Sequence, residues 1–164
     1  MHTKSIWVLL IMLALTGAVC AQTKLSGELK CEKPEPIYSL VVGDRSDHTF
    51  NIGKIKCSAS KPFVIEGLKF VSEDATIFSE ATGDRFSSQG RNVGTMSNGD
   101  KYYVSTQVSG TGKIGTARSA EVKWTYNGGT GTLKGLTGKG TSKCKGAADG
   151  SSLCVVEGEY QIKK

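Results

Sequence analysis

The chain has 164 residues, a length that suits one domain, and its 21 Lys and Arg against 15 Asp and Glu give a net charge of +6. Glycine supplies 21 residues, nearly twice the usual share of about 7%, yet three prolines and the lack of a collagen-like period exclude a collagen or a proline-rich linker. Hydrophobic residues make up 38% and are spread along the chain, which excludes wholesale disorder.

Residues 1–21 are typical of a secretory signal peptide. Lys4 provides a short positive n-region, and residues 6–15 form an apolar run that is too short for a transmembrane helix. Val19 and Ala21 suit the −3 and −1 positions of a cut before the next residue. We therefore predict export to the periplasm or the extracellular space.

The folded domain is predicted to cover residues 22–164, and no later apolar run in it approaches membrane length. An alternative for the leader is a lipoprotein signal with Cys20 acylated, although that motif requires Gly or Ala at the position of Val19. Cleavage before residue 22 removes Cys20 and leaves four cysteines. An even number of cysteines in a small exported domain points to disulfides.

The four remaining cysteines are predicted to form two disulfide bonds. Cys144 and Cys154 each lie five residues from Asp149, the centre of an Asp-Gly turn signal, so they would face each other across a hairpin. Cys31 and Cys57 then pair by elimination. The spacings contain no C-x₂₋₄-C knuckle, so no metal site is expected.

The rest of the chain consists of short runs rich in Val, Ile, Thr, Phe and Tyr, separated by Gly, Asn and Asp. This spacing, without any sustained helical period, predicts an antiparallel barrel or sandwich. The Asn-Gly pair at 98–99 is a strong signal for a hairpin with a type I′ turn. The expected strands cover residues 37–42, 49–57, 63–71, 75–81, 84–97, 101–109, 118–127, 130–145 and 152–163.

The C-terminal half shows the clearest two-residue alternation. Apolar side chains in 119–126 alternate with polar ones, which predicts a half-buried strand. In 131–145 one face becomes small, through Gly138 and Gly140, and small inward residues suit a tightly curved barrel strand. We therefore predict an all-β fold, a single antiparallel barrel of about eight strands with two disulfides.

The outer face of the same expected strand is basic. Lys139, Lys143 and Lys145 point outward together and can attract a polyanion or an anionic surface. The alternative is a solvated strand face whose charges discourage edge pairing. Nucleic acid is not expected as a partner of an exported chain without a recognisable nucleic-acid-binding module.

Few residues are suited to catalysis. His48 is the one histidine left after removal of the signal, and it ends the polar segment 44–48, which is either a functional site or an exposed turn. Glu66 lies in the largely apolar run 62–70, where a buried carboxylate would act as a general acid or base and an outward one would be a surface residue. The G-x-G-x-x-G match at 110–115 precedes a strand rather than a helix, so no cofactor is expected.

Four aromatic residues on the expected strands either line a ligand cavity or fill the core. They are Tyr102, Trp124, Tyr126 and Tyr160. The interior of a small barrel can hold one small ligand among such side chains.

The run 128–141 (GGTGTLKGLTGKGT) resembles the G-G-T-G-x-[FL]-x-G-x-x-G-x-G strand of the allene oxide cyclase and dirigent-type barrels. It is also similar to the C-terminal part of small exported bacterial proteins with no assigned role. The resemblance implies an eight-stranded antiparallel barrel. It also implies an interior that takes apolar small molecules, because those families bind such molecules and steer their cyclisation or coupling.

Three functions are consistent with these observations. The first is non-catalytic binding of a small apolar or amphipathic ligand, or of an envelope component. The second is an isomerase or cyclase in which a buried carboxylate such as Glu66 handles a proton. The third is a surface interaction through Lys139, Lys143 and Lys145. A cavity that contains a buried carboxylate favours the enzyme, and a cavity without a titratable group favours the binder.

Overall fold

The computed structural model describes residues 22–113 and 118–163, so the predicted signal peptide at 1–21 lies outside the described residues. This part of the chain contains a short 3₁₀ turn, η1 (Gly131–Leu133), and no helix that is long and apolar enough to cross a membrane. The strands are β1 (Thr23–Cys31), β2 (Ile37–Val41), β3 (His48–Lys61), β4 (Val64–Ile65), β5 (Leu68–Thr82), β6 (Arg85–Met96), β7 (Lys101–Thr111), β8 (Ser119–Gly129), β9 (Leu136–Gly146) and β10 (Ser152–Ile162).

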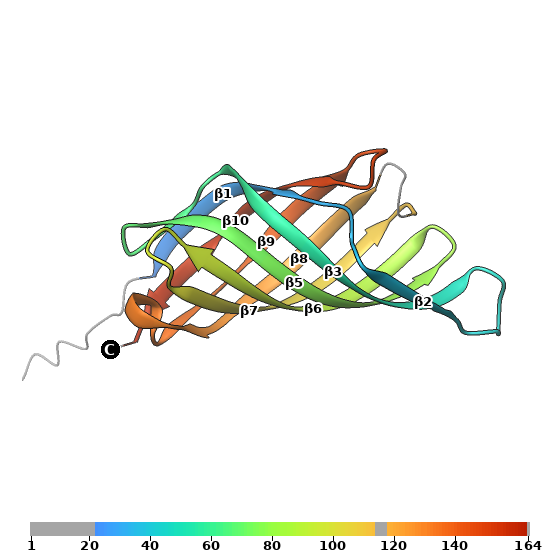
Figure 1. Ribbon diagram of the computed structural model, residues 1–164, viewed down its shortest axis with the longest axis horizontal. Coiled ribbons are helices and arrows are strands. Elements are labelled where there is room, and N and C mark those ends of the chain that lie inside the picture. Colours follow the sequence, from blue (N-terminus) through green and yellow to red (C-terminus); the bar gives the residue numbers. More distant parts are fainter. Residues whose placement is uncertain (1–21, 114–117, 164) are drawn as a thin grey trace, which may run out of the picture.

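Eight of these strands close into a single antiparallel barrel (Figure 1). Each strand from β5 to β9 pairs with the next one along the chain, β10 pairs with β1, and β1 pairs with β3. The pairing of β3 with β5 closes the ring. β2 and β4 are short additions, paired with β3 and β5 respectively. The predicted all-β barrel of about eight strands is confirmed.

Both predicted disulfides are present. Cys144 on β9 and Cys154 on β10 are direct partners in the strand register, as the turn argument requires. Cys31, the last residue of β1, likewise faces Cys57 on β3. The two bonds therefore fasten β9 to β10 and β1 to β3, on either side of the pairing between β1 and β10.

The structure differs from the predictions in one additional strand, one strand start and one turn type. β1 is absent from the expected strands, because Gly27 occupies an inward position where the alternation needs an apolar side chain. The run 130–145 begins with η1, so β9 starts later than expected. The turn at 98–99 lies in the expected place, but Gly99 alone of the pair has a positive φ (88°), so the turn is not of type I′.

β5 is longer than expected. The runs 63–71 and 75–81 are predicted as two strands, with the polar residues 72–74 between them. In the structure the chain turns at 66–67 and then continues as one strand through 72–74, with a register shift between Phe70 and Ser72. This continuity matters for function, because it carries the side chain of residue 73 into the barrel.

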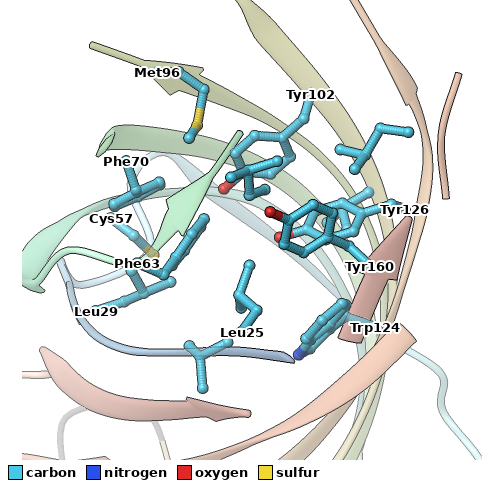
Figure 2. Close-up of a cluster of buried hydrophobic side chains, with 14 of the residues drawn as sticks. Leu25, Leu29, Cys57, Phe63, Phe70, Met96, Tyr102, Trp124, Tyr126 and Tyr160 are labelled. Carbon is cyan, nitrogen blue, oxygen red and sulfur yellow. The ribbon is translucent and has the colours of Figure 1, made fainter. Parts of the chain in front are cut away.

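Glycines on the inner face make room for aromatic rings. A Cβ on Gly94 would overlap the ring of Tyr102, and one on Gly140 or Gly158 would overlap the indole of Trp124. These rings therefore pack against the backbone of neighbouring strands and, with their neighbours, fill one end of the barrel interior (Figure 2). The same buried cluster contains Leu25, Phe63, Ile65, Phe70, Met96, Tyr126, Leu133, Leu136 and Tyr160.

Candidate functional site

The other half of the barrel contains a cavity of about 450 Å³. It extends from the aromatic cluster toward the end of the barrel that carries the β5–β6 and β9–β10 turns, at the right of Figure 1. Small inward side chains from four strands leave this space, and a cavity of this size suits one small ligand. These side chains include Ala75 and Ser79 on β5, Ser88 on β6, Ala120 on β8 and Ser142 on β9.

The inner end of the cavity is aromatic. Tyr102, Trp124 and Tyr126, three of the four aromatic candidates, line it. The ring centre of Tyr126 lies 5.3 Å from that of Tyr102 and 5.0 Å from that of Trp124. Tyr160 is buried in the same cluster (Figure 2) but lies outside the cavity wall, and its hydroxyl accepts a hydrogen bond of 3.2 Å from the backbone N–H of Glu66.

A buried carboxyl group also lies in the cavity wall. Glu73 on β5 accepts a hydrogen bond of 2.6 Å from the hydroxyl of Tyr102 and one of 2.7 Å from the side-chain amide of Asn92. Each of these three residues is at most 9% exposed. Burial raises the pKa of Glu73, and the two hydrogen bonds offset part of that rise. Glu73 therefore favours the neutral carboxylic acid more than an exposed glutamate does.

Three buried polar side-chain atoms in the described part of the chain lack a hydrogen-bond partner. They are Asn92 Oδ1, Arg118 Nε and Trp124 Nε1, and each belongs to a residue that lines the cavity. A buried polar atom without a partner destabilises a protein by about 1–3 kcal/mol, and native structures leave few of them. Their concentration around one cavity is what a site that binds a polar group would show.

The mouth of the cavity is polar and mainly basic. Arg85, Lys113 and Arg118 contribute to it, together with Asp47 from the segment before β3. Arg118 Nη2 donates a hydrogen bond of 3.0 Å to the carbonyl of Gly150, and burial lowers the pKa of the Arg118 guanidinium. The cavity thus combines largely apolar walls with polar groups at both ends, and this combination suits an amphipathic ligand.

Glu66 is not the buried carboxylate. It is exposed in the turn between β4 and β5, with a φ of 50°, and Gly67 beside it has a φ of 77°. Two successive residues with positive φ are what a two-residue hairpin of type I′ requires, so the position serves the turn. Of the two alternatives for Glu66, the structure has the exposed one, and Glu73 on the next strand is the carboxyl group that enters the barrel.

His48 lies on the outer face of the barrel, because the next residue, Thr49, lines the cavity and strand side chains alternate. Its Nδ1 lies 2.7 Å from Asp44 Oδ1 and its Nε2 lies 2.9 Å from Glu80 Oε1. The hydrogen bond to Asp44, and then the one to Glu80, raises the pKa of His48. This geometry fastens the segment 44–48 to β5 and supports a structural role.

No group of three or more His, Cys, Asp or Glu side chains in the described residues is placed to hold a metal ion. The basic residues Lys139, Lys143 and Lys145 are exposed on the outer face of β9. Lys143 stands opposite Glu121 on β8, and Lys139 stands opposite Glu159 on β10. Acidic neighbours therefore interrupt the basic face and weaken it as a site for a polyanion.

Sequence reasoning did not find Glu73 or Asn92. Glu73 stands in a Ser-Glu-Asp segment between two expected strands, and Asn92 is a polar residue within an expected strand. One signal was available, since alternate positions of β6 are Ser88, Gly90, Asn92 and Gly94. A stripe of small and polar residues on the inward face of a barrel strand indicates an interior that is not filled by side chains.

Comparison of the chain with family models, with curated proteins and with solved structures finds no match in any of the three. The resemblance of 128–141 to the allene oxide cyclase and dirigent-type barrels therefore stays a prediction. In the structure this run supplies the end of β8, η1 and the first half of β9. The case for a function rests on the cavity itself.

Proposed function

We propose that this protein binds one small amphipathic ligand inside its barrel and does not transform it. The observation that carries the proposal is the cavity of about 450 Å³ whose lining residues hold all the partnerless buried polar atoms of the described chain. A molecule with an apolar body and polar groups would fill this space and pair with such atoms. An envelope component of that size and chemistry falls within the proposal.

Export of the protein is part of this proposal. It is based on the signal-like composition of residues 1–21. The two disulfides support it, because such bonds form and persist in oxidising compartments. We therefore expect a ligand that is present outside the cytoplasm.

Native mass spectrometry of the protein purified from its own host tests the proposal. We expect one added mass per chain, which is released when the protein is unfolded in organic solvent. Ala120 lines the cavity, so Ala120→Trp should occupy the space and remove the added mass. Ala148 is exposed in the β9–β10 turn, and Ala148→Trp is the matched control that should retain the added mass. A bare protein mass together with an extract free of small molecules would contradict the proposal.

Proton transfer to a bound substrate is the second candidate, because Glu73 places a titratable group in the cavity wall. A carboxyl group with a raised pKa can act as a general acid or base. We rank binding first, since both oxygens of Glu73 already accept hydrogen bonds from Tyr102 and Asn92.

The molecules bound by the wild-type protein and by Glu73→Gln separate the two candidates. If the protein is an isomerase, the two forms should carry molecules of equal mass and different chromatographic retention. Identical molecules in both forms would support binding alone.

A further inference from the structure

Glu73, Tyr102 and Asn92 form one hydrogen-bonded group in the cavity wall, here called the Glu73 cluster. Tyr102 Oη–H donates to Glu73 Oε2 over 2.6 Å, and Asn92 Nδ2–H donates to Glu73 Oε1 over 2.7 Å. Phe63 and Val104 also line the cavity, and Tyr102 and Phe63 both belong to the buried core cluster. The Glu73 cluster therefore marks the inner, enclosed end of the cavity.

Asn92 Oδ1 is an unused acceptor of the Glu73 cluster, and the neutral form of Glu73 adds one hydrogen that the two hydrogen bonds of the cluster do not use. Burial raises the pKa of Glu73 and favours its neutral form, in which Glu73 and Tyr102 each carry an O–H hydrogen. The single contact between Glu73 Oε2 and Tyr102 Oη can use one of these two hydrogens. The other hydrogen takes no part in either hydrogen bond of the cluster, and Asn92 Oδ1 has no partner.

Gly90 makes room for the hydroxyl of Thr106 near the unused acceptor. A Cβ on Gly90 would lie 3.0 Å from Asn92 Oδ1 and would overlap the hydroxyl of Thr106. Thr106 itself lines the cavity. Asn92 and Thr106 thus bring two polar side chains to the part of the cavity wall next to Gly90.

We propose that the Glu73 cluster binds a neutral hydroxyl group at the buried end of the ligand, so that the preferred ligand is an alcohol with a long apolar body. A hydroxyl group accepts one hydrogen and donates one through a single oxygen, which matches the two unused positions of the cluster. This inference rests on the proposed function, because it assigns the chemistry of the ligand in that same cavity.

A carboxylate fits the Glu73 cluster less well. It has no hydrogen to donate to Asn92 Oδ1, and its charge would be buried beside Glu73, where an ionised group is strongly disfavoured. An anionic group would instead be drawn to the mouth, where Arg85 and Arg118 lie. An ether or an alkane would leave the amide oxygen of Asn92 without a donor.

The test displaces a neutral fluorescent probe, N-phenylnaphthylamine, from the intact protein with competitors of equal chain length. The competitors are dodecanol, its methyl ether, dodecane and dodecanoate. Dodecanol should bind about 10-fold more tightly than the ether or the alkane, as one added hydrogen bond to a buried group implies. Dodecanoate should also bind more weakly than dodecanol.

Two variants locate the preference. Asn92→Leu keeps a side chain of similar size without the amide oxygen, so it should abolish the preference for dodecanol over its methyl ether. Ser142→Ala is the matched control, because Ser142 is a buried polar residue of the same cavity on β9, outside the Glu73 cluster. It should keep the preference. If Asn92→Leu does not fold, the competitor series on the unmodified protein still decides the inference.

The outcomes separate this inference from the proposed function. Equal displacement by dodecanol, its ether and dodecane would overturn the inference and leave the proposed function standing. Tightest binding by dodecanoate would also overturn it and would assign recognition to the cations at the mouth. If neither the probe nor any competitor binds, the proposed function fails and the inference fails with it.

Discussion

Gly94→Ala tests whether the glycines of this barrel are needed to seat its aromatic rings. A Cβ on Gly94 would lie closer than 3.0 Å to three atoms of Tyr102. Tyr102 is 1% exposed, so its ring can move only against its packed neighbours or into the cavity that it lines. Any displacement of the ring would also break the hydrogen bond from Tyr102 to Glu73.

Two contributions set the magnitude of the effect. Forcing an extra methyl group into a packed site destabilises the fold by about 1–3 kcal/mol. Separating Tyr102 from Glu73 leaves buried polar groups unpaired and adds about 1–3 kcal/mol. We therefore expect Gly94→Ala to lower the free energy of unfolding by about 2–6 kcal/mol, a large part of the roughly 5–15 kcal/mol typical of a protein.

Equilibrium unfolding in urea with the disulfides intact measures this change. Gly53→Ala is the matched control on β3, because its Cβ would lie 3.2 Å from the Pro36 carbonyl oxygen and 3.5 Å from Ile37, and small shifts relieve such contacts. In a Tyr102→Ala background, Gly94→Ala should no longer destabilise. A loss below about 1 kcal/mol, or equal losses in both backgrounds, would refute the reasoning.

Three further predictions concern Glu73, His48 and the second disulfide. The pKa of Glu73 is raised in the folded protein, so the contribution of Glu73 to the free energy of unfolding falls as the pH rises above the unfolded pKa near 4.5. Urea titrations at several pH values measure this decline, and Glu73→Gln should remove it. An equal decline in both proteins would count against burial of Glu73. The pKa of His48 in the folded protein is raised above 6.5. The stabilisation of the fold by His48 is therefore complete below pH 6.5 and is lost as the pH rises through the folded pKa. An NMR titration midpoint at or below 6.5 would contradict this. Replacing Cys144 and Cys154 by Ser should lower the free energy of unfolding by about 2–4 kcal/mol, and a calorimetric change near zero would contradict it.

The fold class and the disulfides could be predicted because they depend on local patterns. Alternation in 119–126 identifies a half-buried strand whatever lies beside it. The pairing of Cys144 with Cys154 follows from a single hairpin, whose turn determines which residues face each other. Cys31 and Cys57 are then the remaining two of the four cysteines in residues 22–164.

The candidate site could be predicted only in part. The sequence gives two alternatives for Tyr102, Trp124 and Tyr126, lining a cavity or filling the core, and the structure has them in the core cluster and in the cavity wall. The apolar neighbours of Glu66 in the chain make it the candidate for a buried carboxylate, whereas Glu73 lies in a polar segment. That environment is local, whereas burial of a strand residue depends on the strands packed around it.

By itself, the sequence determined that this chain forms an all-β fold with two defined disulfide bonds. Alternation acts within one strand, the Cys144–Cys154 pair belongs to one hairpin, and the Cys31–Cys57 pair follows by elimination. Only the tertiary structure decided that one half of the barrel is filled and the other hollow. Only the registers of β5 with β6 and of β6 with β7, in the barrel closed by β3 and β5, bring Glu73, Asn92 and Tyr102 together. That meeting depends on long-range pairing, which no short stretch of sequence specifies.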